Sequence, residues 1–223
     1  MIRKAYFYVS IEVIQMKNGI FISFEGPDGS GKTTQIERLA AFLKEQGYEC
    51  LITREPGGTA ISEAVRGILL DPAYKEMDYM TEAMLYASAR AQLVAEVIRP
   101  ALSEGKAVIS DRFVDSSVVY QGIARGLGID EVYRLNGFAI QGLMPSLTIH
   151  LDLSAEEGIR RKKNQAELDR LEQEDISFHA QVTEGYRTLA KLSPDRIHTI
   201  DATLPVEVIE ERIRALVQEE FGK

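Results

Sequence analysis

An eight-residue loop near the N-terminus has the residue types needed to hold the phosphates of a nucleoside triphosphate. Residues 26–33 (GPDGSGKT) fit the spacing G-x-x-x-x-G-K-[ST]. Glycines let backbone N–H groups turn inward around phosphate oxygens, and a helix that begins near Lys32 adds its positive end. Lys32 can reach the β and γ phosphates, and the Thr33 hydroxyl can ligate Mg²⁺. The pattern therefore predicts ATP-type binding by Gly26, Pro27, Asp28, Gly29, Ser30, Gly31, Lys32, Thr33 and Thr34.

The alternative for this loop is a chance match in a glycine-containing turn. Such a match is expected in about one of a hundred chains of this length. Here the loop lies between an apolar run at residues 20–24 and a helical pattern at residues 32–46, which is the context that the motif requires. We therefore expect Lys32→Ala to remove the use of a triphosphate.

A charged pair follows another apolar run, at residues 107–110. Asp111 and Arg112 come directly after this run. Because ligands bind at the carboxyl edge of open α/β sheets, Asp111 can orient Mg²⁺ or its water shell there, and Arg112 can clamp a phosphate bidentately. On these two residues alone, a surface ion pair is an equal alternative.

The elements that must position these residues alternate between strands and helices. Apolar or period-2 runs predict strands, and i+3/i+4 patterns predict helices. Strands separated by helices imply a parallel sheet covered on both faces, so we predict an α/β fold with a doubly wound parallel five-stranded sheet. The predicted strands are 20–24, 48–53, 107–110, 147–151 and 197–200; the predicted helices are 32–46, 60–70, 77–104 (perturbed at Pro100), 116–122, 130–141, one capped by Ser154, 178–192 and 206–221.

The bulk composition fits one large globular domain. The chain has 223 residues, of which 45% are hydrophobic and 27% charged, and a net charge of −8. Surfaces that coat nucleic acid or anionic membrane need a sustained positive field, so we expect neither partner. Cys50 is the only cysteine, which excludes an internal disulfide and a Cys-based zinc site. We expect a cytoplasmic location.

The first 16 residues stand apart from the predicted fold. Residues 5–14 are apolar and follow Arg3 and Lys4, as in a signal peptide, but Glu12 interrupts them and no small-x-small cleavage site follows. The run is also shorter than the roughly 18 apolar residues that a membrane helix needs. We interpret residues 1–16 as an N-terminal extension of uncertain role and residues 17–223 as a single domain.

Five ordered segments together resemble the bacterial thymidylate kinases. They are FEGPDGSGKTTQ (24–35), TREPGGT (53–59), TEAMLYASAR (81–90), DRFVDSSVVYQG (111–122) and ELDRLEQED (167–175). The resemblance runs from about Gly19 to the C-terminus. It implies a nucleoside monophosphate kinase-like P-loop fold with a small helical lid at about residues 157–176. It also implies transfer of the γ-phosphate of Mg-ATP to dTMP, giving dTDP and ADP in dTTP biosynthesis, and a homodimer.

The resemblance further implies an acceptor site. Arg54 and Arg66 would hold the acceptor phosphate, Asp28 would accept the sugar 3′-hydroxyl, and Tyr120 would form a wall against a ribose 2′-hydroxyl. The residues implied to bind dTMP are Asp28, Arg54, Arg66, Tyr86, Arg90, Arg112, Ser116, Ser117, Tyr120 and Gln121. Those implied in catalysis are Lys32, Arg112, Asp111 and Glu55, with Thr33, Asp111 and Glu55 at the metal.

The helix predicted over residues 80–98 supports such a site independently. An apolar stripe at i+3/i+4 spacing faces the core, whereas Tyr86 and Arg90 lie on a different face. The resemblance places thymine against that face, stacked on Tyr86 and hydrogen-bonded to Arg90 and Gln121, although many members have Phe at the Tyr86 position. We also expect Asp115 to cap the next short helix. The apolar stripe comprises Met80, Met84, Ala87, Ala91, Val94 and Ile98.

The basic run at residues 158–170 (GIRRKKNQAELDR) is the source of the expected lid charge. Some family members carry an Arg inside the phosphate loop, but this chain has Gly-Ser-Gly at residues 29–31. A solvated basic helix face is the competing interpretation. Which residue contacts ATP stays open among Arg160, Arg161, Lys163 and Arg170.

Two other functions remain as alternatives. Another nucleotide or nucleoside kinase would use Tyr86, Arg90 and Gln121 for a different base. A P-loop ATPase or GTP switch would hydrolyse triphosphate without a small acceptor, although the later strands carry no N-K-x-D guanine signature.

Overall fold

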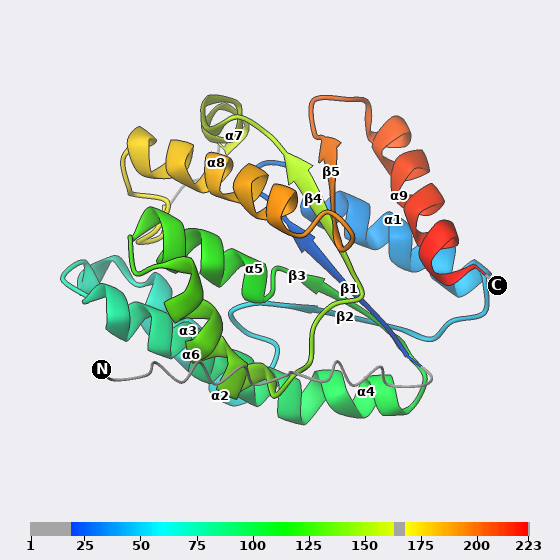
Figure 1. The fold of residues 1–223 in the computed structure, drawn as a ribbon, viewed down its shortest axis with the longest axis horizontal. Coiled ribbons are helices and arrows are strands. Elements are labelled where there is room, and N and C mark those ends of the chain that lie inside the picture. The colour runs from blue at the N-terminus through cyan, green and yellow to red at the C-terminus, as the bar shows by residue number, and fades with distance from the viewer. Residues whose placement is uncertain (1–18, 163–167, 223) are drawn as a thin grey trace, which may run out of the picture.

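A computed structural model of the chain describes residues 19–162 and 168–222 and contains one five-stranded parallel sheet. The strand order is β2-β3-β1-β4-β5 (Figure 1). The strands are β1 (Ile20–Glu25), β2 (Cys50–Arg54), β3 (Ala107–Asp111), β4 (Leu147–Asp152) and β5 (Ile197–Asp201). All five coincide with predicted strands to within two residues at each end, and the predicted α/β fold is confirmed.

Helices cover both faces of this sheet. Helices α1 and α9 lie against one face, whereas α3, α4, α5, α6 and α8 lie on the other (Figure 1). The helices are α1 (Lys32–Glu45), α2 (Ala60–Leu70), the 3₁₀ turn η1 (Pro72–Tyr74), α3 (Tyr79–Leu93), the π-helical η2 (Val94–Ile98), α4 (Arg99–Ser103), α5 (Val114–Ser117), the π-helical η3 (Val118–Ala124), α6 (Ile129–Ile140), α7 (Ala155–Lys162), α8 (Ile176–Leu192) and α9 (Val206–Phe221).

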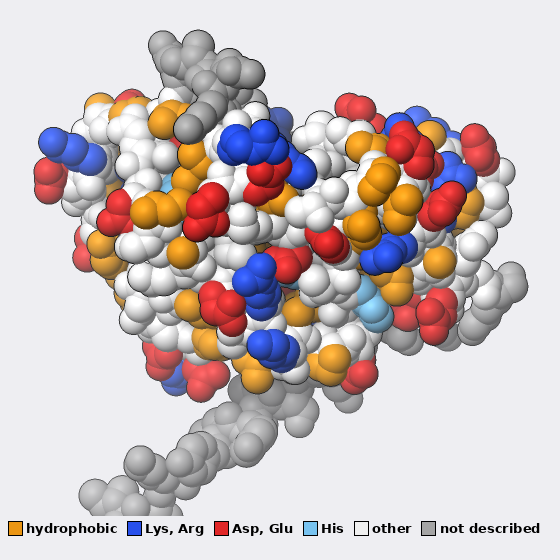
Figure 2. Space-filling view, turned by 90° about the horizontal axis from the view of Figure 1, so that it is seen from above, with side chains coloured by type: hydrophobic (Ala, Val, Ile, Leu, Met, Phe, Trp, Pro, Cys, Tyr) orange, Lys and Arg blue, Asp and Glu red, His pale blue; other side chains and the backbone are white. Residues whose placement is uncertain are grey.

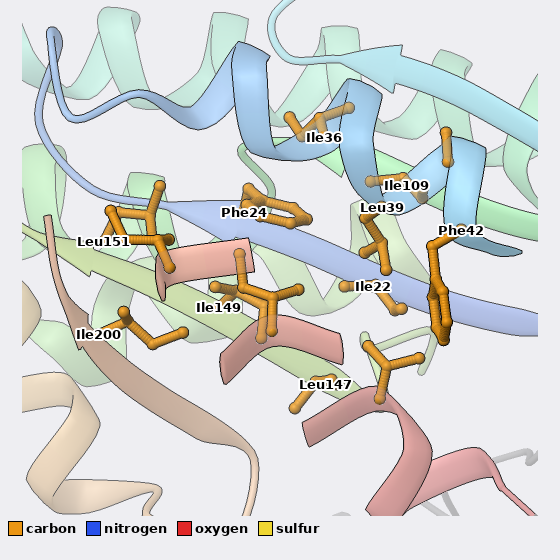
Figure 3. Packing of buried hydrophobic residues seen from close by; sticks show 14 of the residues in the cluster. Ile22, Phe24, Ile36, Leu39, Phe42, Ile109, Leu147, Ile149, Leu151 and Ile200 are labelled. Atoms are coloured by element: carbon orange, nitrogen blue, oxygen red, sulfur yellow. The ribbon is translucent and has the colours of Figure 1, made fainter. Parts of the chain in front are cut away.

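The central strand β1 presents different chemistry to the two faces. Ile20, Ile22 and Phe24 pack into the core between the sheet and helices α1 and α9 (Figure 3). Successive side chains of a strand point to opposite faces, so Ser23 and Glu25 lie on the other side. Both are buried there, and the Ser23 hydroxyl bonds to the Thr148 hydroxyl at 2.8 Å. The strand thus carries a buried carboxylate to the ligand edge of the sheet.

The long helix predicted over residues 77–104 is divided into three parts. Pro100 lies in the first turn of α4, and a π-helical turn directly precedes that helix. The expected core stripe on this helix is wrong at its start. Met80 and Met84 are exposed, whereas Ala87, Val94 and Ile98 are buried as expected.

The expected cap by Asp115 is also wrong. Asp115 lies inside α5, and its carboxylate binds the Arg196 guanidinium with bonds of 2.6 and 2.8 Å. A buried carboxylate needs such a partner because isolated charges are costly to bury. Arg196 lies 81 residues further along the chain, just before β5.

The space-filling view shows acidic and basic side chains interspersed over the face seen from above Figure 1 (Figure 2). Among the helices that the structure describes, none combines the length and the apolar character needed to cross a membrane. The predicted extension at residues 1–16 lies outside the described residues.

Candidate active site

The loop between β1 and α1 has the geometry of an anion site. Gly31 is the N-cap of α1 with φ 90°, and within the described chain no side chain caps this helix start. The first N–H groups of a helix lack intrahelical partners and attract anions, so a free helix start suits phosphate. Gly26 has φ 135°, and a Cβ there would lie 2.5 Å from the Leu151 carbonyl oxygen. Only glycine can occupy this position without strain.

Lys32 lies at the centre of this loop. Its Nζ donates to the Gly26 carbonyl at 3.1 Å and to the Pro27 carbonyl at 3.2 Å. Burial, together with the charge of Arg112, lowers the pKa of Lys32 to about 8, although Asp28 and other nearby carboxylates oppose the shift. A desolvated ammonium held among carbonyl dipoles is well suited to bind an anion that brings compensating charge.

Arg112 extends from the end of β3 toward the same loop. Its backbone has φ 71°, and its N–H donates to the Phe24 carbonyl at 2.9 Å, one step beyond the β1–β3 ladder. The guanidinium binds the Asp28 carboxylate at 2.7 Å and the Tyr186 hydroxyl at 3.0 Å. It also lies over the Tyr120 ring, 5.3 Å from the centroid. These contacts fix the guanidinium beside the phosphate loop.

Two cavities meet at this point. The first, at the phosphate loop, is lined by Gly29, Gly31, Lys32, Thr33, Thr34, Arg54, Asp111 and Arg161. The second extends toward α3, η3 and α8, and its wall includes Tyr86, Arg90, Ser116, Ser117, Tyr120 and Gln121. Four charged residues line both cavities: Asp28, Glu55, Arg66 and Arg112. We call these four residues, which line both cavities, the shared wall. Two phosphate-bearing ligands, one in each cavity, would both lie beside it.

The first cavity also contains oxygen donors of the kind that Mg²⁺ prefers. Asp111 Oδ1 and Glu55 Oε1 are buried and have no hydrogen-bond partner among the described residues. Thr33 adds an exposed hydroxyl in the same cavity. No group of three or more His, Cys, Asp or Glu in the described part of the chain is arranged to hold a metal. The two buried carboxylate oxygens and the Thr33 hydroxyl fit Mg²⁺, which usually takes one or two carboxylates together with substrate phosphates and waters.

Comparison with known proteins decides the family. The family model for thymidylate kinase matches residues 24–213. The chain is 52% identical over 208 residues to a thymidylate kinase of Geobacillus sp. (strain WCH70), covering 92% of this chain and 99% of the relative. It is 52% identical over 206 residues to that of Lactobacillus helveticus (strain DPC 4571), covering 90% and 96%. The chain belongs to the thymidylate kinase family.

A solved structure agrees with this assignment. The crystal structure of thymidylate kinase from Ehrlichia chaffeensis matches with a TM-score of 0.72 at 31% identity, covering 90% of this chain and 99% of that one. The P-loop nucleoside monophosphate kinase fold predicted for the thymidylate kinase family is therefore the fold of this chain.

The predicted acceptor residues are brought together almost completely. Every one of them except Arg54 lines the second cavity. Arg54 lines the phosphate-loop cavity instead, where its Nη2 binds both oxygens of Glu63 at 3.0 Å. Arg66 lines both cavities and donates to the Pro56 carbonyl at 2.9 Å. The two arginines thus flank the boundary between the cavities.

Arg90 is more constrained than the helix pattern implied. Its guanidinium is buried, and all five N–H groups meet acceptors: Glu55 Oε2 twice, the Ser117 and Asn136 side chains, and the Phe113 carbonyl. This pairing also turns the Glu55 carboxylate toward Arg90. Burial raises the pKa of Glu55, and the charge of Arg90 opposes that shift.

The lid candidates occupy three different environments. Arg161 lines the phosphate-loop cavity and donates to the Gly29 carbonyl at 3.3 Å, whereas Arg160 is exposed and paired with Glu157. Arg170 is buried away from the phosphate loop, bound to the Glu82 carboxylate at 2.6 Å and to the Leu69 carbonyl at 2.8 Å. Lys163 lies outside the described residues.

Sequence reasoning missed Glu25. This buried carboxylate accepts hydrogen bonds from the Phe113 backbone N–H at 2.8 Å, the Ser116 hydroxyl at 2.6 Å and the Tyr186 hydroxyl at 3.1 Å. The same two hydroxyls accept from Arg112 Nη1. Burial, with the charge of Asp115, raises the pKa of Glu25 to about 7. The sequence contained one signal for this residue. Glu25 is an acidic residue at the end of a buried strand, and it lies on the polar face of that strand.

Three further ionisable residues of the second cavity were not predicted. Asp169, Glu172 and His179 line the second cavity from the chain segment before α8 and from α8 itself. Burial raises the pKa of Asp169, to which the charges of Glu172 and Asp28 also contribute. The quoted segment at residues 167–175 includes two of these positions, but its charges were assigned only to the lid.

Proposed function

We propose that this protein transfers the γ-phosphate of ATP to thymidine monophosphate, giving ADP and thymidine diphosphate. The observation that carries the proposal is the shared wall: Asp28, Glu55, Arg66 and Arg112 line both cavities. ATP phosphates in the first cavity would face an acceptor phosphate in the second. In-line phosphoryl transfer depends mainly on such alignment and on charge stabilisation.

The chain's own residues would act by placing positive charge beside the negative charge of the phosphates during transfer. Lys32 and Arg112 offset charge on the migrating group, and Arg66 holds the acceptor phosphate against repulsion from ATP. Arg54 adds positive charge from the phosphate-loop cavity. A phosphate monoester has a second pKa of about 6, so its attacking oxygen is largely ionised at pH 7 and no dedicated base is required. Arg161 is our choice for the lid contact to ATP because it already lies at the phosphate loop.

We assign the metal site to Thr33, Asp111 and Glu55. Their oxygens line the phosphate-loop cavity, and two of them are buried without a partner among the described residues. Thr33, Asp111 and Glu55 would hold Mg²⁺ there, and the bound ion would offset phosphate charge. Because ATP is the proposed donor, we place the protein in the cytoplasm.

The base and sugar of the acceptor are assigned to the deeper part of the second cavity. Tyr86 offers a ring for stacking, and Gln121 offers a polar group beside it. Arg90 lines the same cavity, but its five N–H groups already meet protein acceptors. We assign Tyr120 to a wall against a ribose 2′-hydroxyl, and Ser116 and Ser117 to further contacts with the acceptor. We assign Asp28, which lines both cavities, to the sugar 3′-hydroxyl.

The testing experiment measures ADP formation from Mg-ATP with each nucleoside monophosphate offered separately, with Lys32→Ala as the blank. Turnover with thymidine monophosphate, and weakly with deoxyuridine monophosphate, would support the proposal. Equal turnover of another base would keep a kinase but remove the assigned base pocket. ADP release without an acceptor would move the protein to the ATPase class.

We also propose a homodimer formed through helices α2, α3 and α6. These helices pack side by side and expose large apolar side chains, among which Phe138 is 86% exposed. Exposed apolar side chains that form a contiguous patch often mark a protein–protein interface, and we assign these side chains to one. The other exposed members are Ile61, Ile68, Tyr79, Met80 and Met84.

A further inference from the structure

A fully buried carboxylate lies directly behind the base-binding part of the second cavity. Glu82 on α3 is 0% exposed and does not line the cavity, whereas its neighbour Gln121 is 1% exposed and does. The Gln121 Nε2 donates to Glu82 Oε1 at 2.8 Å. Glu82 is therefore separated from any ligand by one side chain, the amide of Gln121.

The other groups that contact Glu82 hold its carboxylate in place. Arg170 Nη2 donates to Oε2 at 2.6 Å, and Arg125 Nη2 donates to the same oxygen at 3.3 Å. Both arginine side chains are nearly buried. Two guanidinium groups thus offset the negative charge, which a buried carboxylate requires.

The chemistry of this pair determines which end of the Gln121 amide faces the ligand. A carboxylate only accepts hydrogen bonds, whereas an amide has a donating NH₂ and an accepting oxygen. If the amide turned over, two acceptor oxygens would meet at about 2.8 Å. The NH₂ end must therefore face Glu82, and among the described residues no group donates to Gln121 Oε1. The acceptor oxygen is the end left for the base.

We propose that Glu82 is a positioning residue that sets the base specificity of the kinase by fixing the Gln121 amide with its oxygen toward the cavity. This inference rests on the proposed function and deepens it. An acceptor oxygen matches a base that carries N3–H, such as thymine. It opposes a cytosine-type base, whose N3 is itself an acceptor. A buried site built for one hydrogen-bonding pattern strongly rejects a ligand that leaves its groups unpaired.

The test compares dTMP with 5-methyl-deoxycytidine monophosphate, which has the same outline but lacks N3–H. The readout is the ratio of kcat/KM for the two acceptors. In Glu82→Gln the residue at position 82 can donate as well as accept, so Gln121 can turn its NH₂ toward the cavity. We expect the ratio to fall about tenfold or more, the range for one mispaired buried polar group. Glu82→Asp, which stays acceptor-only, should retain more of the ratio.

A double-mutant cycle separates this role from a general structural one. If Glu82 acts through Gln121, then Glu82→Gln should not lower the ratio further in a Gln121→Ala background. A matched control is Glu96→Gln, because Glu96 accepts from Gln92 Nε2 at 2.7 Å in an equivalent pair on the exposed side of the helix. That variant should leave the ratio unchanged.

The inference is wrong if Glu82→Gln keeps the wild-type ratio, if its effect is the same with Gln121→Ala, or if neither Glu82 variant folds. The last result would give Glu82 a role in stability alone. Failure of the wild-type protein to phosphorylate dTMP would instead reject the proposed function, so the two failures are distinguishable.

Discussion

Two buried ionisable residues, Glu25 directly before the phosphate loop and Lys32 within it, respond to burial in opposite ways. Burial favours the uncharged form, which lowers the pKa of Lys32 to about 8 and raises that of Glu25 to about 7. Both values lie close to physiological pH. Each residue therefore makes a measurable property of the protein depend on pH between about 5 and 9.

Lys32 should make ATP use pH-dependent. Its ammonium must be charged to bind phosphate, so kcat/KM for ATP should fall above about pH 8, approaching tenfold per pH unit as the free enzyme loses the proton. Initial rates at saturating dTMP between pH 7 and 9.5 measure this. Lys32→Arg keeps its charge throughout the range, so its profile should lack the fall. A flat wild-type profile to pH 9.5 would contradict the assignment.

Glu25 should affect stability with the opposite sign from most carboxylates. Its pKa is higher in the folded protein, at about 7, than the roughly 4.3 of an unfolded chain. The folded state therefore holds the proton more tightly, and the stability from this residue is complete below about pH 4.3 and is lost as pH rises toward 7 and just beyond. The slope for one proton is at most about 1.4 kcal/mol per pH unit.

Urea unfolding of wild type and Glu25→Gln at several pH values between 5 and 8 checks this sign. The free energy of unfolding of the wild type should decline relative to the variant as pH rises. A difference that stays constant, or grows in favour of the wild type, would refute it.

At the scale of elements, the close packing of α7 on the phosphate loop selects one basic residue from several. A Cβ on Gly158 would lie 2.7 Å from the Asp28 carbonyl oxygen, so the α7 backbone touches the loop directly. This approach brings Arg161 to Gly29, while the adjacent Arg160 points into solvent.

Arg161→Ala and Arg160→Ala form a matched pair of variants. Both residues pair with Glu157 on the surface, and such exposed pairs contribute little. We expect Arg161→Ala to lower kcat/KM for ATP by about tenfold or more, as loss of a charge-assisted phosphate contact does, and Arg160→Ala by less than about twofold. Equal effects in steady-state assays would count against the choice of Arg161.

The elements also show how far local patterns predict this fold. The five strands and the phosphate loop have strong local signals, and they were predicted because apolar runs, glycines and caps act within a few residues. The π-helical turns at Val94–Ile98 and Val118–Ala124 were not, because a shift from i+4 to i+5 bonding leaves little trace in an apolar pattern. The role of Asp115 depended on Arg196, a partner distant in sequence.

The candidate site divides in the same way. Residues within the quoted motifs, such as Tyr120 and Gln121, could be placed at the second cavity in advance. Glu25, Glu82 and Arg170 owe their surroundings to contacts between elements far apart in the chain, so their environments could not be predicted from neighbouring residues.

At the scale of the whole molecule, the exposed apolar face of α2, α3 and α6 explains why the predicted core stripe failed. Met84 is 52% exposed in the single chain although its spacing matches Ala87 and Val94. A helix pattern reports that a residue is apolar, but it does not distinguish a core from a surface that a second subunit covers. The proposed dimer accounts for both observations.

Phe138→Glu should therefore yield a monomer. Within the proposed interface a buried charge at this position would be strongly unfavourable, while the same residue on a free surface costs little. Light scattering coupled to size exclusion at micromolar concentration measures the mass. Glu131→Gln, an exposed change on the same helix, should keep the dimer. A wild type that is monomeric under these conditions would reject the interface.

The shared wall between the cavities has a thermodynamic consequence. Two polyanions on either side of Asp28, Glu55, Arg66 and Arg112 sense the same charges, so their binding free energies are coupled, and the coupling must be reciprocal. If bound ATP changes the affinity for dTMP by some factor, bound dTMP changes the affinity for ATP by the same factor. Because the arginines of the wall offset repulsion between the two anions, removing one of them should make binding of either substrate less favourable to binding of the other.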